Sequence, residues 1–298
     1  MSLVGIDLGG TKLAAVRIRE GEIVARARIP NTSQAEGLVD CARAGIESVW
    51  DVDVAAVGVG VAGLVSWPEG VFAWGPHVAG IGIPLRAALE TRLGVPVVVD
   101  NDANTALHAE MVEGAGVGSS ELVMVTVGTG IGGAIAFNGT VRRGRSFAGE
   151  FGHIAVTGDG EPCACGRRGC WETEASGPAL SRLASLGGIV DTAPEAVVAA
   201  AAAGDEAAEH ALTRVGEALG RGVISLVLSL DPEVVIVGGG LGSIGDALLE
   251  PARAVVDADL PGRPNRKAPP IVAARFGDEG GAIGAAMLAG IRLQEDQR

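Results

Sequence analysis

Hydrophobic and polar positions alternate in blocks at the start of the chain. A largely apolar segment over residues 3–8 is followed by a glycine-rich turn, a second such segment over 13–18, a polar turn and a third segment over 23–29, in which apolar residues are interrupted by Arg26 and Arg28. Short apolar runs separated by glycine turns are typical of β-strands. The pattern predicts an antiparallel meander at the N-terminus.

The same succession returns in the second half. An apolar run at 122–127 leads into a glycine-rich turn at 128–133 and a returning strand at 134–137. A later run at 234–237 leads into Gly238-Gly239-Gly240, and an earlier one at 54–61 is ended by Gly63. Each half therefore has a glycine turn with a threonine inside a hairpin, which indicates two related α/β halves and a ligand between them.

Helical and remaining strand segments complete the expected organisation. We expect helices over residues 35–49, 85–93, 193–204, 205–230 and 246–256, one opening at 100–103, strands at 95–99 and 271–276, and an irregular segment at 67–84. Gly220 and Gly222 inside the long helix indicate close helix packing. The expected domains are an N-terminal lobe, 1–118, with a C-terminal helix at about 284–298 as its candidate completion, and a C-terminal lobe, 119–283.

Composition narrows the class of protein. The chain has 298 residues, 48% of them hydrophobic and 20% charged, and a formal net charge of −13. An acidic chain repels polyanions, so nucleic acid is not an expected partner. No apolar run reaches the roughly 18 residues of a spanning helix, and no basic leader precedes the first strand. We expect a soluble, cytoplasmic protein.

Three of the four cysteines lie beside a histidine. Cys163, Cys165 and Cys170 follow His153 closely, which is metal-ligand spacing. In a reducing compartment such a cluster is more often a zinc site than a pair of disulfides. The fourth, Cys41, is expected to pack in a core.

Both glycine turns are candidate phosphate sites, because backbone N–H groups approach phosphate where no Cβ intervenes and a threonine hydroxyl adds a donor. Thr11 and Thr129 are the donors in question. Asp7 is placed to hold a hydrated magnesium ion, and Lys12 to neutralise nucleotide charge. One such turn is more often a plain hairpin bend, and the presence of two favours phosphate binding.

A dinucleotide site is the weaker alternative. The pattern Gly-x-Gly-x-x-Gly occurs at 128–133 and 240–245. A strand follows the first, and after the second the next strand, at 271–276, starts too late for the required acidic residue about 20 positions on. An NAD-dependent oxidoreductase is therefore disfavoured.

Taken together, these strings resemble the ROK family of sugar kinases and regulators, over nearly the whole chain. The matching strings are Asp7-Leu8-Gly9-Gly10-Thr11-Lys12, Asn101-Asp102, Gly128-Thr129-Gly130-Ile131-Gly132-Gly133, Glu150-x-Gly152-His153, Cys163-x-Cys165-Gly166-x-x-Gly169-Cys170-x-Glu172, Gly238-Gly239-Gly240 and Gly280-Gly281. The resemblance implies two actin-like (ribonuclease H-like) α/β lobes, with mixed sheets flanked by helices and a ligand cleft between them.

The resemblance also implies an ATP-dependent hexose kinase that transfers the γ-phosphate to a sugar hydroxyl. Asp102 would accept the hydroxyl proton, although its position also suits a helix N-cap. The implied sugar contacts are Asn101, Asp102, Glu150, His153 and Glu172. The implied nucleotide contacts are Asp7, Gly9, Gly10, Thr11, Lys12, Gly128, Thr129, Gly130, Gly239 and Gly240. Mg²⁺ with ATP, a structural zinc on His153, Cys163, Cys165 and Cys170, and a homodimer complete the implied description.

The resemblance ranks glucose first, partly on Cys170-Trp171-Glu172. One loop departs from glucokinase-like members: Pro76-His77-Val78 and Gly80-Ile81 stand where an amide and a glycine-tryptophan pair are usual. N-acetylmannosamine, N-acetylglucosamine or another hexose remain alternative acceptors, and polyphosphate an alternative donor.

Two further classes stay open. A sugar-responsive regulator of the family would carry a helix-turn-helix before the first phosphate motif, where this sequence has only residues 1–6. An actin-like filament or chaperone ATPase would not need the cysteine-ordered loop.

Overall fold

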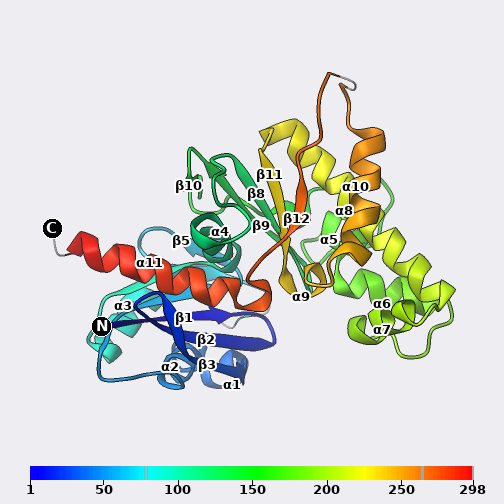
Figure 1. Ribbon diagram of the computed structural model, residues 1–298. Coiled ribbons are helices and arrows are strands. Elements are labelled where there is room, and N and C mark those ends of the chain that lie inside the picture. The colour runs from blue at the N-terminus through cyan, green and yellow to red at the C-terminus, as the bar shows by residue number, and fades with distance from the viewer. Residues whose placement is uncertain (77, 79, 263–264, 297–298) are drawn as a thin grey trace. The chain divides into compact units, whose positions relative to one another are not determined.

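The computed structural model describes residues 1–76, 78, 80–262 and 265–296 (Figure 1). The chain divides into two compact units. The first unit comprises Met1–Gly118, Ala134–Ala148 and Asp278–Arg298, and the second Ser119–Gly133 and Gly149–Gly277. This division differs from a single boundary after residue 118, because the segment Ala134–Ala148 belongs to the first unit.

One five-stranded sheet has the order β3-β2-β1-β4-β7. Its strands are β1 (Ser2–Leu8), β2 (Lys12–Arg19), β3 (Glu22–Pro30), β4 (Val54–Val61) and β7 (Val97–Asn101). The first three pair antiparallel, and β4 lies parallel to both β1 and β7. The predicted N-terminal meander is confirmed.

The second five-stranded sheet repeats this plan in the order β10-β9-β8-β11-β12 (Figure 1). Its strands are β8 (Leu122–Val127), β9 (Ile131–Phe137), β10 (Thr140–Val141), β11 (Val234–Gly238) and β12 (Ile271–Ala273). β10 pairs antiparallel with β9, and β11 lies parallel to β8 and β12. The repeat predicted from the hydrophobic pattern is therefore present in the strand order.

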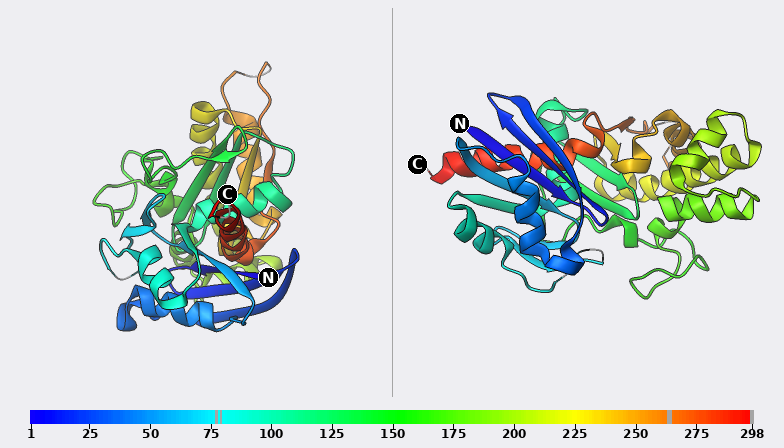
Figure 2. Two further views of the ribbon diagram at one scale, coloured as in Figure 1. Left: turned by 90° about the vertical axis from the view of Figure 1, so that its left-hand side faces the viewer. Right: turned by 90° about the horizontal axis from the view of Figure 1, so that it is seen from below.

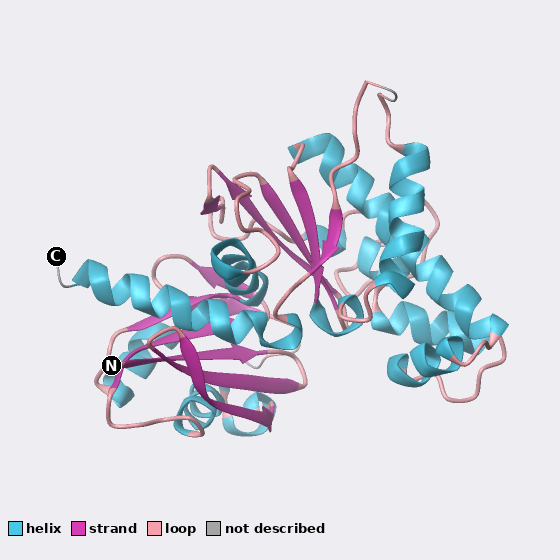
Figure 3. Ribbon diagram, viewed as in Figure 1, coloured by secondary structure: helices cyan, strands magenta, loops and turns pink. Residues whose placement is uncertain are grey.

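Helices flank the sheets (Figure 3), and β5 (Leu64–Ser66) and β6 (Val71–Trp74) form a separate two-stranded sheet that packs on the core of the first one. The helices are α1 (Ser33–Glu36), α2 (Leu38–Glu47), α3 (Leu85–Leu93), α4 (Asp102–Glu113), α5 (Trp171–Ala175), α6 (Gly177–Leu186), α7 (Pro194–Ala202), α8 (Glu206–Leu230), α9 (Gly239–Gly242), α10 (Asp246–Asp259) and α11 (Gly280–Asp296), with 3₁₀ turns at Phe151–His153 and Gly277–Glu279. None of them, within the described ranges, has the length and apolar character needed to cross a bilayer.

Three local predictions were wrong in detail. The helix expected over 35–49 is divided by Gly37, whose φ of +89° interrupts helical geometry. The segment 67–84, expected to be irregular, contains β6. The last strand ends at Ala273 rather than at residue 276.

Helix α11 packs on the first sheet through glycines (Figure 2). A Cβ on Gly5 of β1 would lie 1.9 Å from the carbonyl oxygen of Ala282, and one on Gly58 of β4 would lie 1.8 Å from that of Ala285. Only residues without a side chain permit such an approach. The contact fixes α11 against the strand that carries Asp7.

The second unit packs around Trp171, which is fully buried. Its indole nitrogen donates to the carbonyl oxygen of Ala218 in α8 at 2.9 Å. A Cβ on Gly222 would lie 1.9 Å from the Trp171 ring, and one on Gly220 would lie 2.6 Å from the carbonyl oxygen of Ala252. The close helix packing predicted from these two glycines is confirmed.

Candidate active site

The junction of β7 and α4 presents Asn101 and Asp102 side by side. Asn101 is the N-cap: its Oδ1 accepts from the backbone nitrogens of Ala103 at 2.9 Å and Asn104 at 3.2 Å. Asp102 is the first helical residue. The alternative role of Asp102 as the N-cap is therefore wrong, and its carboxylate is not needed to cap the helix.

Two contacts hold Asp102. The Nδ2 of Asn101 donates to the Oδ1 of Asp102 at 2.9 Å. The same nitrogen also donates to the carbonyl oxygen of Gly63 at 3.1 Å, which fixes the amide. The hydroxyl of Thr105 donates to the backbone carbonyl of Asp102 at 2.8 Å. Burial raises the pKa of Asp102, the hydrogen bonds oppose this rise, and the charge of Asp100 adds to it. A carboxylate with a raised pKa is a stronger proton acceptor.

The first phosphate turn joins β1 to β2. The backbone nitrogen of Gly9 donates to the carbonyl oxygen of Lys12 at 3.0 Å, and the Asn31 side chain donates to the Gly9 carbonyl at 2.7 Å. Gly10 is half-buried and Thr11 is exposed. The Asn31 side chain thus holds the turn, and Thr11 is accessible to solvent.

Lys12, which follows this turn, forms an ion pair with Asp278. Its Nζ lies 2.8 Å from Oδ2 of Asp278, so part of its charge is already compensated. No local signal in the sequence indicated this pairing, because the two residues lie at opposite ends of the chain.

Asp7, at the end of β1, has an unusual carboxylate. Its Oδ1 is buried without a hydrogen-bond partner, and a Cβ on Gly281 would lie 2.5 Å from its Oδ2. Burial, followed by the charges of Asp102 and Asp278, raises the pKa of Asp7 to about 8, and Lys12 opposes this rise. A buried carboxylate oxygen without a donor suits a cation, and oxygen ligands are those that Mg²⁺ prefers.

The second phosphate turn joins β8 to β9 within the second unit. The backbone nitrogen of Gly128 donates to the carbonyl oxygen of Gly130 at 2.9 Å, with Thr129 between them. The backbone nitrogen of Gly177, at the start of α6, donates to the Gly128 carbonyl at 2.8 Å. Gly177 was not predicted from the sequence, since a glycine in the first turn of a helix carries no distinctive signal.

The glycines after β11 lie beside this turn. Gly239 has a φ of +80°, and a Cβ there would lie 2.6 Å from the carbonyl oxygen of Val127. Gly240 follows it in α9. The structure therefore brings the predicted glycines 128, 130, 239 and 240 together with Thr129 at one end of the parallel strand pair β8 and β11.

Four side chains of the cysteine-rich loop converge. The ligand atoms of His153, Cys163, Cys165 and Cys170 all lie within 4.8 Å of one another. The Sγ atoms of Cys165 and Cys170 are 3.6 Å apart, as are the Sγ of Cys163 and the Nδ1 of His153. Tetrahedral zinc with bonds of about 2.3 Å needs ligand atoms about 3.8 Å apart. The donor set fits a structural zinc ion.

Glu172 lies between this cluster and the second phosphate turn. Its Oε1 is 2.9 Å from the Sγ of Cys163 and 3.5 Å from the Nδ1 of His153. A Cβ on Gly130 would lie 2.8 Å from its Oε2. Since Nδ1 of His153 faces the thiols, Nε2 is the nitrogen available to a substrate. Glu150 is exposed, at the start of the 3₁₀ turn that carries His153.

The loop that departs from the glucokinase-like pattern is described in part. His77 lies outside the described residues, and Ile81 is 78% exposed. The structure does not support the alternative of a dinucleotide site. The strand after α10 is β12, which consists of Ile271, Val272 and Ala273 and therefore has no acidic residue to bind a ribose.

The ion pair of Asp100, close to Asp102, was not predicted from the sequence. Asp100 is buried and forms an ion pair with Arg143, whose Nη2 lies 2.7 Å from Oδ2 of Asp100. The string Asp100-Asn101-Asp102 could have marked the carboxylate, but nothing in the sequence pointed to its partner.

A family model matches residues 3–291 of the chain, and its description is "ROK family". The chain belongs to the ROK family. The predicted fold class, two actin-like α/β lobes with mixed sheets flanked by helices, is thereby confirmed.

ROK sugar kinases are among the relatives of this chain. It is 36% identical to a glucokinase of Streptomyces coelicolor over 306 residues, covering 96% of each chain. It is 31% identical to an N-acetylmannosamine kinase of Escherichia coli over 294 residues, covering 97% of this chain and 98% of the relative. The crystal structure of a ROK glucokinase from Streptomyces griseus in complex with glucose and AMPPNP is similar with a TM-score of 0.92 and 36% identity, covering 98% of this chain and all of the other.

Proposed function

We propose that this ROK protein is an ATP-dependent hexose kinase and that glucose is its preferred acceptor. The observation that carries the proposal is the β7–α4 junction. Asn101 caps the helix, so the Asp102 carboxylate is not used as the cap; it accepts a hydrogen bond from the Asn101 amide, and its pKa is raised. The similarity to glucokinases, including one crystallised with glucose and AMPPNP, supports the substrate pair.

In the proposed reaction, Asp102 accepts the proton of a sugar hydroxyl as the hydroxyl oxygen bonds to the γ-phosphorus of ATP. The bond from that phosphorus to the β–γ bridging oxygen breaks, and ADP leaves. Such a transfer depends on in-line positioning and on neutralisation of phosphate charge. Glu150, the Nε2 of His153 and Glu172 would bond the sugar hydroxyls and orient the acceptor. Asn101, predicted as a further sugar contact, already uses its amide on the helix cap, Gly63 and Asp102, so its proposed part is to orient Asp102.

The nucleotide would be held by the two glycine turns. Backbone N–H groups of Gly10 and Gly130, with the hydroxyls of Thr11 and Thr129, are the proposed phosphate donors. The N–H groups of Gly9 and Gly128 close the two turns, so these glycines would shape the phosphate sites and allow close approach of the nucleotide. Gly239 and Gly240 would contact the nucleoside, and Lys12 would add its charge. Asp7 is the residue that would hold Mg²⁺ through water, and the ion would supply charge neutralisation to the phosphates.

A structural zinc ion on His153, Cys163, Cys165 and Cys170 completes the proposal. Its role would be to order the loop that carries His153 and Glu172. Because such thiols must stay reduced to bind metal, we place the protein in the cytoplasm. We further propose that it acts as a homodimer.

The N-acetylmannosamine kinase relative makes that sugar the second candidate acceptor. A coupled assay of ADP release should compare glucose, N-acetylmannosamine and N-acetylglucosamine, with ATP or polyphosphate as donor. We expect the highest kcat/KM for glucose with ATP. A preference for another sugar would change the acceptor only. ATP hydrolysis indifferent to every sugar, or no turnover at all, would overturn the kinase.

A further inference from the structure

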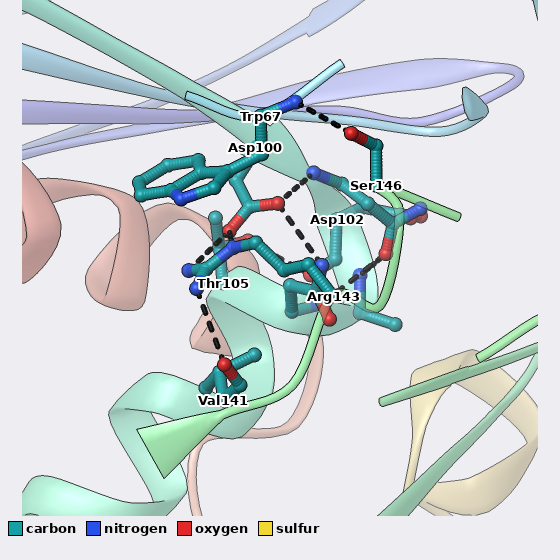
Figure 4. Close-up of polar contacts among 10 residues, drawn as sticks. Trp67, Asp100, Asp102, Thr105, Val141, Arg143 and Ser146 are labelled. Carbon is teal, nitrogen blue, oxygen red and sulfur yellow. Dashed lines mark hydrogen bonds and ion pairs between the residues drawn. The ribbon is translucent and has the colours of Figure 1, made fainter. Parts of the chain in front are cut away.

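Asp100 is a buried carboxylate whose two oxygens are both used, with an exposed fraction of 2%. Its Oδ1 accepts from the backbone nitrogen of Asn101 at 2.8 Å and from the side chain of Asn104 at 3.0 Å. Its Oδ2 accepts from Nε of Arg143 at 2.8 Å (Figure 4). Asp100 thus ties the end of β7 to the first turn of α4.

Arg143 is fixed on three sides, and its side chain is only 13% exposed. Besides Asp100, it donates through Nη1 to the carbonyl oxygen of Val141 at 3.3 Å. Its guanidinium carbon lies 3.8 Å from the centre of the Trp67 ring, a cation–π geometry. The backbone nitrogen of Trp67 in turn donates to the hydroxyl of Ser146 at 3.1 Å. These contacts hold the segment after β10 against the site (Figure 4).

A short chain of contacts connects this arginine to Asp102. Arg143 holds Asp100, Asp100 holds the backbone nitrogen of Asn101, and the Asn101 amide donates to Asp102. Each link is a hydrogen bond of 2.8 or 2.9 Å, and all the residues belong to the first unit.

The pairing also has an electrostatic consequence. Without Arg143, a buried carboxylate would be left unpaired two residues from Asp102, which is costly and would repel the charge that Asp102 must carry. The guanidinium offsets part of this repulsion and holds the Asp100 carboxylate in place beneath the β7–α4 junction.

We infer that Arg143 is a positioning residue for phosphoryl transfer, acting on Asp102 through Asp100 and Asn101. The inference rests on the proposed kinase function. In the proposed reaction Arg143 contacts neither the sugar nor ATP. Its loss should therefore lower kcat and leave the affinity for the nucleotide unchanged.

The test compares Arg143→Met with the double variant Asp100→Asn/Arg143→Met. In the single variant we expect kcat to fall about 10- to 100-fold, the loss that small misplacements of reacting groups cause, with KM for ATP little changed. In the double variant the new amide at position 100 still offers an oxygen to the backbone nitrogen of Asn101 but carries no charge, so most of the lost kcat should return. A residue that only fills space would not be rescued by a second substitution.

The matched control is Arg145→Met, since Arg145 is an exposed arginine of the same segment. If Arg143→Met does not fold, Arg143→Lys keeps the charge without the planar fork, and its kcat should be reduced but measurable. An unchanged kcat in a folded Arg143 variant, or a loss in Arg143→Met that Asp100→Asn does not recover, would overturn the inference. A wild-type protein inactive on every sugar would instead refute the proposed function.

Discussion

The side chain of Asn101 joins two tasks, because its oxygen caps α4 while its nitrogen donates to the carboxylate of Asp102 at 2.9 Å. The cap fixes the asparagine rotamer, and the fixed rotamer directs the amide at its neighbour. The orientation of the proposed proton acceptor, Asp102, therefore depends on the residue that caps the helix, Asn101.

Changing Asn101 to Ser should separate the two tasks. Serine caps helices about as well as asparagine, so the cap itself is kept, and the free energy of unfolding should fall by only about 0.5–1.5 kcal/mol for the lost bond to the Gly63 carbonyl. The donor to Asp102 is lost, and a hydrogen bond to a charged group is worth about 1.5–3 kcal/mol, so kcat should fall about 10- to 100-fold. Steady-state kinetics and urea unfolding measure the two effects.

The matched control is Asp205→Ser in the N-cap of α8, which accepts from the backbone nitrogens of Ala207 and Ala208. It should leave kcat unchanged. Equal losses of kcat in both cap variants would contradict a special role for Asn101.

The cysteine cluster predicts about one zinc ion per chain in purified protein, measured by atomic emission. Cys165→Ser should lower the zinc content well below one per chain. Because Glu172 and His153 then lose their fixed positions, the sugar dissociation constant should rise at least about tenfold.

Cys41→Ser is the control for that experiment. Cys41 is buried in the core of the first unit, 3.7 Å from the side-chain oxygen of Asn31, and serine can donate there too. The control should keep its zinc. Full sugar affinity in zinc-free protein would show that the metal has no part in ordering the loop.

Gly222→Ala tests the contact between α8 and the ring of Trp171, the residue before Glu172. A methyl group there would lie 1.9 Å from the Trp171 ring, so either the indole or α8 must move. We expect a loss of about 1–3 kcal/mol in the free energy of unfolding, measured with urea. Gly158→Ala, where a Cβ meets nothing within 4 Å, should leave stability nearly unchanged. Similar stability of the two variants would refute the tight contact.

Asp7 should make stability depend on pH in the absence of metal and nucleotide. Its folded pKa, about 8, lies above the unfolded value of about 3.9, so the folded state binds the proton more tightly. The resulting stabilisation is complete below about pH 4 and is lost as the pH rises towards 8.

The measurement is the free energy of unfolding of wild type and Asp7→Asn from about pH 5 to pH 8. Wild type should lose stability relative to the variant as the pH rises, because asparagine does not titrate. A difference that stays constant over this range would mean that Asp7 is ionised throughout.

Much of the fold could be predicted because its signals are local. The strands of both sheets are short apolar runs bounded by glycine, and each hairpin contains its own turn, so neighbours in sequence are neighbours in space. The cysteines and His153 also lie close in sequence, which is why their convergence could be expected.

Other features depended on choices that local sequence leaves open. Asn101 and Asp102 are equally good caps, and only the path of the backbone after β7 decides between them. Gly37 interrupts an apolar pattern that reads as one helix. Arg143 lies 43 positions from Asp100, and their pairing follows from the tertiary fold alone.

The most direct test of the account is the transfer of the γ-phosphate of ATP to glucose in a single turnover, by wild type and by Asp102→Asn. Wild type should form a sugar phosphate, and the variant should do so about 10²- to 10⁴-fold more slowly while binding glucose nearly as well, because only the proton acceptor is lost. Asp159→Asn, an exposed aspartate elsewhere, should match wild type. An Asp102→Asn protein that transfers phosphate at the wild-type rate would contradict the central role of Asp102.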